Sequence, residues 1–154
     1  MKLLQITSLS ENQKLQLFQL WNAEYPVNLS YVSINDFENY LSKLEKARHF
    51  LFESETNEIK AWAFTFDREN ERWFAIILSQ DMQGKGIGKQ LMEIIQTQEN
   101  ALSGWVVDHN NYTKTNGKAY VSPLGFYEKC GFTLISHTRL EMEMISAVKI
   151  FWKK

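Results

Sequence analysis

Hydrophobic and polar positions near the amino terminus follow first a strand period and then a helix period. Residues 2–7 predict a short strand. A helix is expected next, because Ser10 and Gln13 have the spacing of a capping box and Pro26 ends the helical pattern. A second helix is predicted after Ser33, with an apolar face made of Ile34, Phe37, Leu41 and Leu44.

Three strand-like runs follow in quick succession, over residues 49–53, 59–67 and 72–79. Because only short polar turns separate them, we expect an antiparallel meander. After the third run the chain enters a glycine-rich turn and then a helix, whose apolar stripe is made of Ile87, Leu91, Ile94 and Ile95.

The remaining third of the chain predicts three more strands and one short helix. The strands are expected over residues 103–108, 134–142 and 147–152, and residues 109–118 form a polar loop. The helix is expected to begin at Pro123 with Ser122 as its N-cap, and to end in a left-handed turn at Gly131.

The glycine-rich turn is the first candidate for chemistry. It joins the apolar run 73–78 to the helix that follows, and its three glycines let a ligand approach the backbone. Free N–H groups at the start of a helix favour phosphate. The turn consists of Gln83, Gly84, Lys85, Gly86, Ile87, Gly88 and Lys89.

The spacing within this turn separates several kinds of phosphate loop. A P-loop needs Ser or Thr where Gln90 stands, and a dinucleotide fingerprint needs glycine where Lys89 stands. A KH clamp needs Gly-x-x-Gly, which the turn does not contain. The pattern Gln-x-x-Gly-x-Gly remains, and a glycine turn that only starts a helix is the structural alternative.

Two ordered motifs carry a resemblance to a known family. The pattern Gln-x-x-Gly-x-Gly at residues 83–88 resembles the pyrophosphate-binding signature of the GNAT N-acetyltransferase superfamily, which holds coenzyme A. The pattern Phe-Tyr-x-Lys-x-Gly-Phe at residues 126–132 resembles the superfamily's second signature. An amphipathic helix with buried Phe126 and Tyr127 is the alternative for the second motif.

The resemblance implies a mixed α/β (α+β) fold with a mainly antiparallel central sheet. The sheet would have about six to seven strands and about four flanking helices. Two strands, ending near Ser79 and Asp108, would splay apart and hold acetyl-CoA between them. Backbone groups at Leu78 and Ser79 would bind the pantetheine arm, and the amides from Gln83 to Lys89 would bind the pyrophosphate.

The resemblance also implies a role for Tyr127 as the acid that protonates the leaving thiolate. A phenol has a pKa of about 10 and is therefore protonated at neutral pH. A hydrogen bond that only positions the sulfur is the alternative role. Many relatives carry a glutamate on the strand before the glycine loop, but residues 73–79 contain no carboxylate. Asp108 is then the first candidate base, with Glu24 and Asp36 after it.

The second motif also departs from the family pattern. Many members carry an asparagine and an alanine before the tyrosine, where this chain has residues 120–123. The three histidines are scattered without the spacing of metal ligands, so no metal site is expected. Cys130 has no base partner that the sequence places near it.

Composition limits the remaining classes. The 154 residues, 44% of them hydrophobic, predict one globular domain over residues 1–154. The net charge of −1 lacks the excess of positive charge that is typical of proteins binding nucleic acid or an acidic membrane. No apolar run approaches a membrane span or a signal peptide, so we expect a cytoplasmic protein, monomeric or homodimeric.

The charge is unevenly distributed along the chain. Residues 1–71 hold 7 Lys or Arg against 11 Asp or Glu, whereas residues 72–154 hold 10 against 7. The basic half would suit a polyanionic cofactor, and the acidic half would suit a cationic acceptor such as a polyamine, an aminoglycoside or a protein amine. Ordinary surface charge explains the distribution equally well.

Three functions follow from these observations. The first is an acetyl-CoA-dependent N-acetyltransferase that acts on a primary amine in a ternary complex. The second is a module of the same fold that binds CoA or acyl-CoA as a sensor or scaffold without turnover. The third is a protein-interaction domain that uses its aromatic residues and binds no CoA.

Overall fold

The computed structural model describes all residues from Met1 to Lys154 and contains seven strands and four α-helices. The strands are β1 (Lys2–Ile6), β2 (Glu45–Glu53), β3 (Ile59–Arg68), β4 (Glu71–Leu78), β5 (Ala101–Val106), β6 (Thr133–Met142) and β7 (Ile145–Lys153). The helices are α1 (Glu11–Glu24), α2 (Ile34–Ser42), α3 (Ile87–Gln98) and α4 (Leu124–Lys129), with single 3-10 turns at η1 (Val27–Leu29) and η2 (Gln80–Met82). None of the helices is long and apolar enough to cross a membrane.

Local signals determine where most of these elements begin and end. The predicted capping box is confirmed, because Ser10 Oγ accepts the Gln13 N–H and the Gln13 side chain accepts the Ser10 N–H. The left-handed turn at Gly131 is confirmed by its φ of +92°. Pro123, not Ser122, is the N-cap residue of α4, but the Ser122 hydroxyl still accepts the Leu124 N–H at 3.3 Å while it donates to the Val107 carbonyl.

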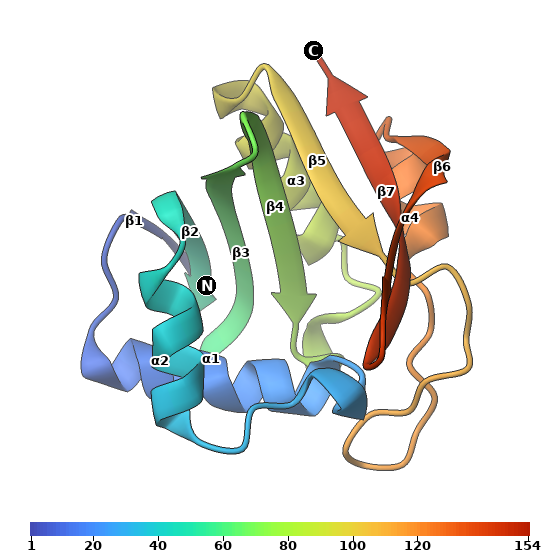
Figure 1. Cartoon of the computed structure of the whole chain (residues 1–154). Coiled ribbons are helices and arrows are strands. Elements are labelled where there is room, and N and C mark those ends of the chain that lie inside the picture. Colours follow the sequence, from blue (N-terminus) through green and yellow to red (C-terminus); the bar gives the residue numbers. More distant parts are fainter.

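All strands join one sheet in the order β1-β2-β3-β4-β5-β7-β6, and the only parallel neighbours are β4 and β5 (Figure 1). Two left-handed residues, Glu69 and Asn70, turn the chain between β3 and β4. The predicted meander and the mainly antiparallel sheet are therefore confirmed, with helices on both of its faces.

Each face of the sheet has its own hydrophobic core. One core packs α1 and α2 on the sheet around Leu17, Phe37 and Trp62. The other packs α3 and α4 on the opposite face around Leu91 and Ile150. The alternating side chains of β3 serve both cores, which fixes the register of this central strand.

The two parallel strands separate soon after they meet. β4 and β5 form a single backbone pair, Trp73 with Ser103, and then diverge toward their carboxyl ends (Figure 1). The Ser79 N–H donates to the Lys60 carbonyl, and the antiparallel alternation then turns the polar backbone groups of Ile76 and Leu78 away from β3. The result is a notch between two strands, in which these backbone groups have no partner in the sheet.

Candidate functional site

The glycine loop lies at the open end of this notch and has the geometry of an anion site. Gly84 and Gly86 have φ values of +77° and +81°, which favour glycine. Gly86 caps α3 without a side-chain hydrogen bond, so the first N–H groups of the helix have no capping partner. A Cβ at Gly84 or Gly86 would meet no atom within 4 Å, so a ligand has room above the backbone.

Gln83 ties this loop to its surroundings. Its Nε2 donates to the Leu78 carbonyl at 3.2 Å and to Glu24 Oε1 at 3.4 Å. The side chain therefore joins the end of β4 to the end of α1. Gly88 is buried in the first turn of α3, where an added Cβ would lie 3.2 Å from the Phe126 ring.

A large cavity continues from the loop through the notch. Its volume is about 980 Å³, and 25 of its 34 lining residues are hydrophobic. Most of the residues that the sequence predicted for the cofactor line it, namely Leu78, Gln83, Gly84, Gly86, Ile87, Gly88, Lys89 and Tyr127. A cavity of this size is in the range of small-molecule sites.

Two predicted cofactor residues lie outside the cavity lining. The Ser79 N–H donates to the Lys60 carbonyl and its hydroxyl donates to Asp81 at 2.6 Å, so both of these groups are already engaged. The Lys85 side chain is exposed. Their assignments as cofactor residues stay predictions.

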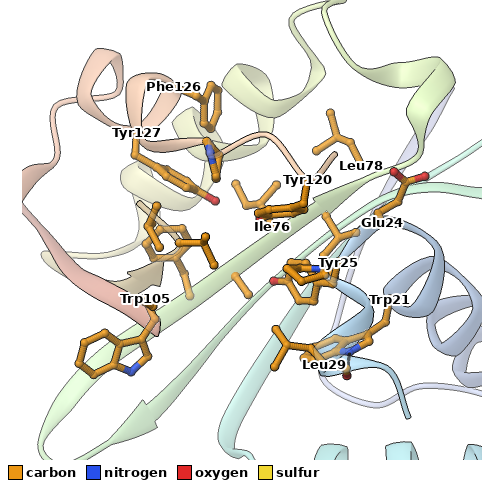
Figure 2. Close-up of a pocket in the computed structure, with 18 of the residues that line it drawn as sticks. Trp21, Glu24, Tyr25, Leu29, Ile76, Leu78, Trp105, Tyr120, Phe126 and Tyr127 are labelled. Atoms are coloured by element: carbon orange, nitrogen blue, oxygen red, sulfur yellow. Dashed lines mark hydrogen bonds between the residues drawn. The ribbon is translucent and has the colours of Figure 1, made fainter. Parts of the chain in front are cut away.

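Tyr127 lies in a rigid aromatic setting on α4. Its ring packs against Phe74, Phe126 and Phe132 at centroid distances of 5.1–5.7 Å. The hydroxyl points into the cavity between the strands (Figure 2). Burial raises the pKa of Tyr127 above its usual value, and the neighbouring Tyr120 raises it further, so the phenol is neutral across the physiological range.

Two further tyrosines line the cavity near Tyr127. Burial raises the pKa of Tyr120 to about 12 and also raises the pKa of Tyr25. Tyr31 and Tyr40, which follow Tyr25 in the chain, line the same cavity. Tyr120 lies where the second motif departs from the family pattern, and no sequence signal gave it a role.

Asp108 is held by Arg139 on β6. Its two carboxylate oxygens accept from Arg139 Nη1 and Nη2 at 2.8 and 3.1 Å. This bidentate pair holds the pKa of Asp108 below its usual range. The residue does not line the cavity, so the geometry offers it no route to a substrate proton, and its role as a base stays a prediction.

Glu24 is the one carboxylate that lines the cavity. It accepts from Lys114 Nζ at 3.2 Å and from the Gln80 N–H at 3.2 Å, in addition to Gln83. Sequence analysis placed Glu24 after Asp108 as a candidate base. No local sequence pattern shows that the end of α1 lies beside the end of β4. No group of His, Cys, Asp and Glu residues in the molecule could hold a metal ion.

Comparison with protein families identifies the class. A parallel strand pair that splays beside a glycine loop and an open helix N-terminus can bind a phosphate-bearing ligand. Residues 45–134, more than half of the chain, match the model of the acetyltransferase (GNAT) domain. The chain belongs to the GNAT acetyltransferase family.

Solved structures share the fold at low sequence identity. An aminoglycoside 6'-N-acetyltransferase complexed with coenzyme A has a TM-score of 0.73 and 12% identity, covering 99% of this chain and 97% of its own. Spermidine N-acetyltransferase from Vibrio cholerae, in complex with CoA and spermine, has a TM-score of 0.67 and 16% identity, covering 98% and 95%. No curated protein sequence matches the chain.

Proposed function

We propose that this protein transfers the acetyl group of acetyl-CoA to a primary amine. The observation that carries the proposal is the continuous path from the open helix N-terminus at Gly86 through the notch to the Tyr127 hydroxyl. The amides at the start of α3 would hold the pyrophosphate, and the backbone of Ile76 and Leu78 would hold the pantetheine arm.

The donor supplies the acetyl group as a thioester, and the residues of this chain handle two protons. The amine nitrogen forms its bond to the carbonyl carbon while the carbon–sulfur bond breaks. Tyr127 gives its proton to the departing sulfur, and the attacking nitrogen loses one proton. The products are an N-acetyl amide and the free thiol of CoA, and a proton from solvent restores Tyr127.

Glu24 is the better supported acceptor for the amine proton. It lines the cavity, whereas Asp108 does not. A water molecule would connect the amine with the Glu24 carboxylate. The alternative, a module that binds CoA without turnover, is favoured by the lack of any carboxylate in residues 73–79.

Calorimetric titration with acetyl-CoA tests the first part of the proposal. Gly86→Glu should abolish binding, because it adds a side chain and a negative charge where the pyrophosphate would lie. Gly117→Glu is the matched control, since Gly117 also has a left-handed φ, +83°, and also has open space around it. Equal binding by wild type and both variants would contradict this site. If wild type does not bind acetyl-CoA, the third hypothesis, a protein-interaction domain that binds no CoA, is favoured.

Steady-state kinetics test the role of the phenol. Tyr127→Phe should lower kcat by about 10²-fold while the Kd for acetyl-CoA stays close to wild type, because only the proton donor is lost. Tyr120→Phe removes a hydroxyl from the same cavity and should cost less. A weaker Kd with little change in kcat would instead assign Tyr127 a positioning role.

The same assay tests Glu24. Glu24→Gln keeps the shape of the side chain but cannot take a proton, so the rate should reach its plateau at a higher pH than in wild type. The reason is that the free amine must then form in solution, where a lysine-like amine has a pKa of about 10.4. An unchanged pH profile would contradict this role.

A further inference from the structure

The charges along the cavity are few and unevenly placed. Only Glu24, Arg68 and Lys89 are charged among its 34 lining residues. Lys89 lies in the first turn of α3 beside the glycine loop. Arg68 lies at the end of β3, with its guanidinium 4.9 Å from the centre of the Phe66 ring. The part of the cavity away from the loop therefore has one carboxylate at most.

That carboxylate is already paired. Glu24 and Lys114 form an ion pair at 3.2 Å, and their side chains are only 12% and 11% exposed. Glu24 also accepts from the Gln80 N–H and the Gln83 side chain. A second ammonium group in the cavity would find no free carboxylate, and an unpaired buried charge is strongly unfavourable.

The acidic character of the amino-terminal half does not reach the cavity. Of the 11 Asp and Glu residues in positions 1–71, Glu24 alone lines it. Glu71, for example, is bound by Lys149 at 2.8 Å at the closed end of the notch. The surplus of negative charge is thus outside the proposed site and supplies no binding groups for a polycation.

Aromatic side chains, rather than charged ones, line much of the cavity. We call the part of the cavity lined by Trp21, Tyr25, Tyr31, Tyr40, Trp73 and Trp105 the aromatic chamber. Figure 2 shows Trp21, Tyr25 and Trp105 around the same hollow as Tyr127. Trp73 and Trp105 stack with their centroids 5.3 Å apart, and Trp21 contacts Tyr25 edge to face at 4.6 Å. Lys149 Nζ already lies 5.4 Å from the centre of the Trp73 ring, and the other fixed ring faces can bind a planar apolar group or a single cation.

Resting on the proposed acetyl transfer, we propose that the acceptor is a monoamine with an aromatic or similarly apolar body. The body lies against the rings of the aromatic chamber and the one amino group reaches the thioester near Tyr127. Polyamines and aminoglycosides are poor acceptors, because each additional ammonium group would be desolvated without a partner.

The test compares acceptors that differ in charge and apolar surface. Protein with acetyl-CoA is given 2-phenylethylamine, tryptamine, spermidine or kanamycin, and the CoA thiol and the acetylated product are both measured. We expect kcat/KM for the two aromatic amines to exceed that for spermidine and kanamycin on the order of tenfold or more. Binding of each amine to CoA-loaded protein, followed by tryptophan fluorescence, gives a readout without turnover.

A charge placed on an exposed residue of the cavity lining tests the electrostatic reason for this preference. Met144 lines the cavity, and because its side chain is 48% exposed, a polar residue is tolerated there. Met144→Glu should lower the preference for 2-phenylethylamine over spermidine several-fold. Met144→Gln has nearly the same size without the charge and is the matched control. An equal change in both variants would overturn the electrostatic argument.

Each outcome separates this inference from the proposed function. A preference for spermidine or kanamycin would overturn the monoamine assignment and leave acetyl transfer intact. If acetyl-CoA binds but no amine is bound or acetylated, the inference fails while the cofactor site stands. Tighter binding of octanoyl-CoA, in competition with 2-phenylethylamine, would assign the chamber to an acyl chain. Absence of acetyl-CoA binding would overturn both proposals.

Discussion

His49 is a titratable residue in the core of the molecule. Its ring is 4% exposed on β2 and stacks on Trp62, whose Nε1 donates to His49 Nδ1 at 3.1 Å. Burial lowers the pKa of His49 from 6.5 to about 4. The native state therefore keeps this imidazole neutral at a pH where the unfolded chain already binds a proton.

We expect His49 to make stability depend on pH between about 6.5 and 4. Above pH 6.5 the neutral His49 costs the native state nothing. As the pH falls toward 4, the free energy of unfolding decreases, because the unfolded chain binds a proton at His49 and the native state does not. The total loss is about 3 kcal/mol. Urea unfolding at several pH values should show a smaller decline for His49→Gln, which cannot titrate. Parallel declines in the two proteins would contradict the assignment.

Sequence reasoning at the residue scale succeeded where a local pattern defines the role. The turn glycines and the Ser10 cap need only neighbours within a few positions, so the pattern predicted their conformations. Tyr127 was found through its motif and indeed faces the cavity. The environment of Asp108 was not predictable, because its partner Arg139 lies 31 positions away on another strand.

Side chains hold the two splayed strands together at the element scale. Besides the single pair of Trp73 with Ser103, Glu71 on β4 accepts from Ser103 Oγ on β5 at 2.8 Å and from Lys149 on β7 at 2.8 Å. Gly104 leaves the space that the Phe74 ring occupies, since an added Cβ would lie 2.6 Å from that ring. Side-chain contacts, rather than a series of backbone hydrogen bonds, therefore hold β4 and β5 together at the closed end of the notch.

Removing the contacts of Glu71 with Ser103 and Lys149 should destabilise the protein. Glu71→Ala is expected to lower the free energy of unfolding by about 1–2 kcal/mol, because the charge-assisted hydrogen bonds from Ser103 and Lys149 are lost in a partly exposed position. Glu93→Ala removes an exposed ion pair, 4.0 Å from Lys89, and should change it by less than about 0.5 kcal/mol. Urea unfolding measures the stability of both variants. Equal midpoints for Glu71→Ala and Glu93→Ala would contradict a stabilising link through Glu71.

The whole molecule depends on a core that crosses the notch. The cluster beneath α3 and α4 combines Phe50 and Ala63 from the first half of the chain with Leu102 and Ile150 from the second. Neither half buries this surface alone. We therefore propose that residues 1–154 form one cooperative domain, although β4 and β5 share only one pair.

A single unfolding transition is the expected result. Urea denaturation followed by tryptophan fluorescence and by far-UV circular dichroism should give coincident curves, because both halves lose the shared core together. Trp62 and Trp152 report on opposite halves of the chain. Two separated transitions, or a stable fragment after limited proteolysis between β4 and β5, would contradict one cooperative domain.

The sequence by itself determined the elements, their order, the glycine turn and the family. These depend on hydrophobic period, caps and short motifs, whose physical causes act over a few residues. Tertiary structure decided the splay of β4 and β5, the meeting of Glu24 with the glycine loop, and the aromatic chamber. Each of these joins residues far apart in the chain, where packing and register select the partners and no local pattern records them.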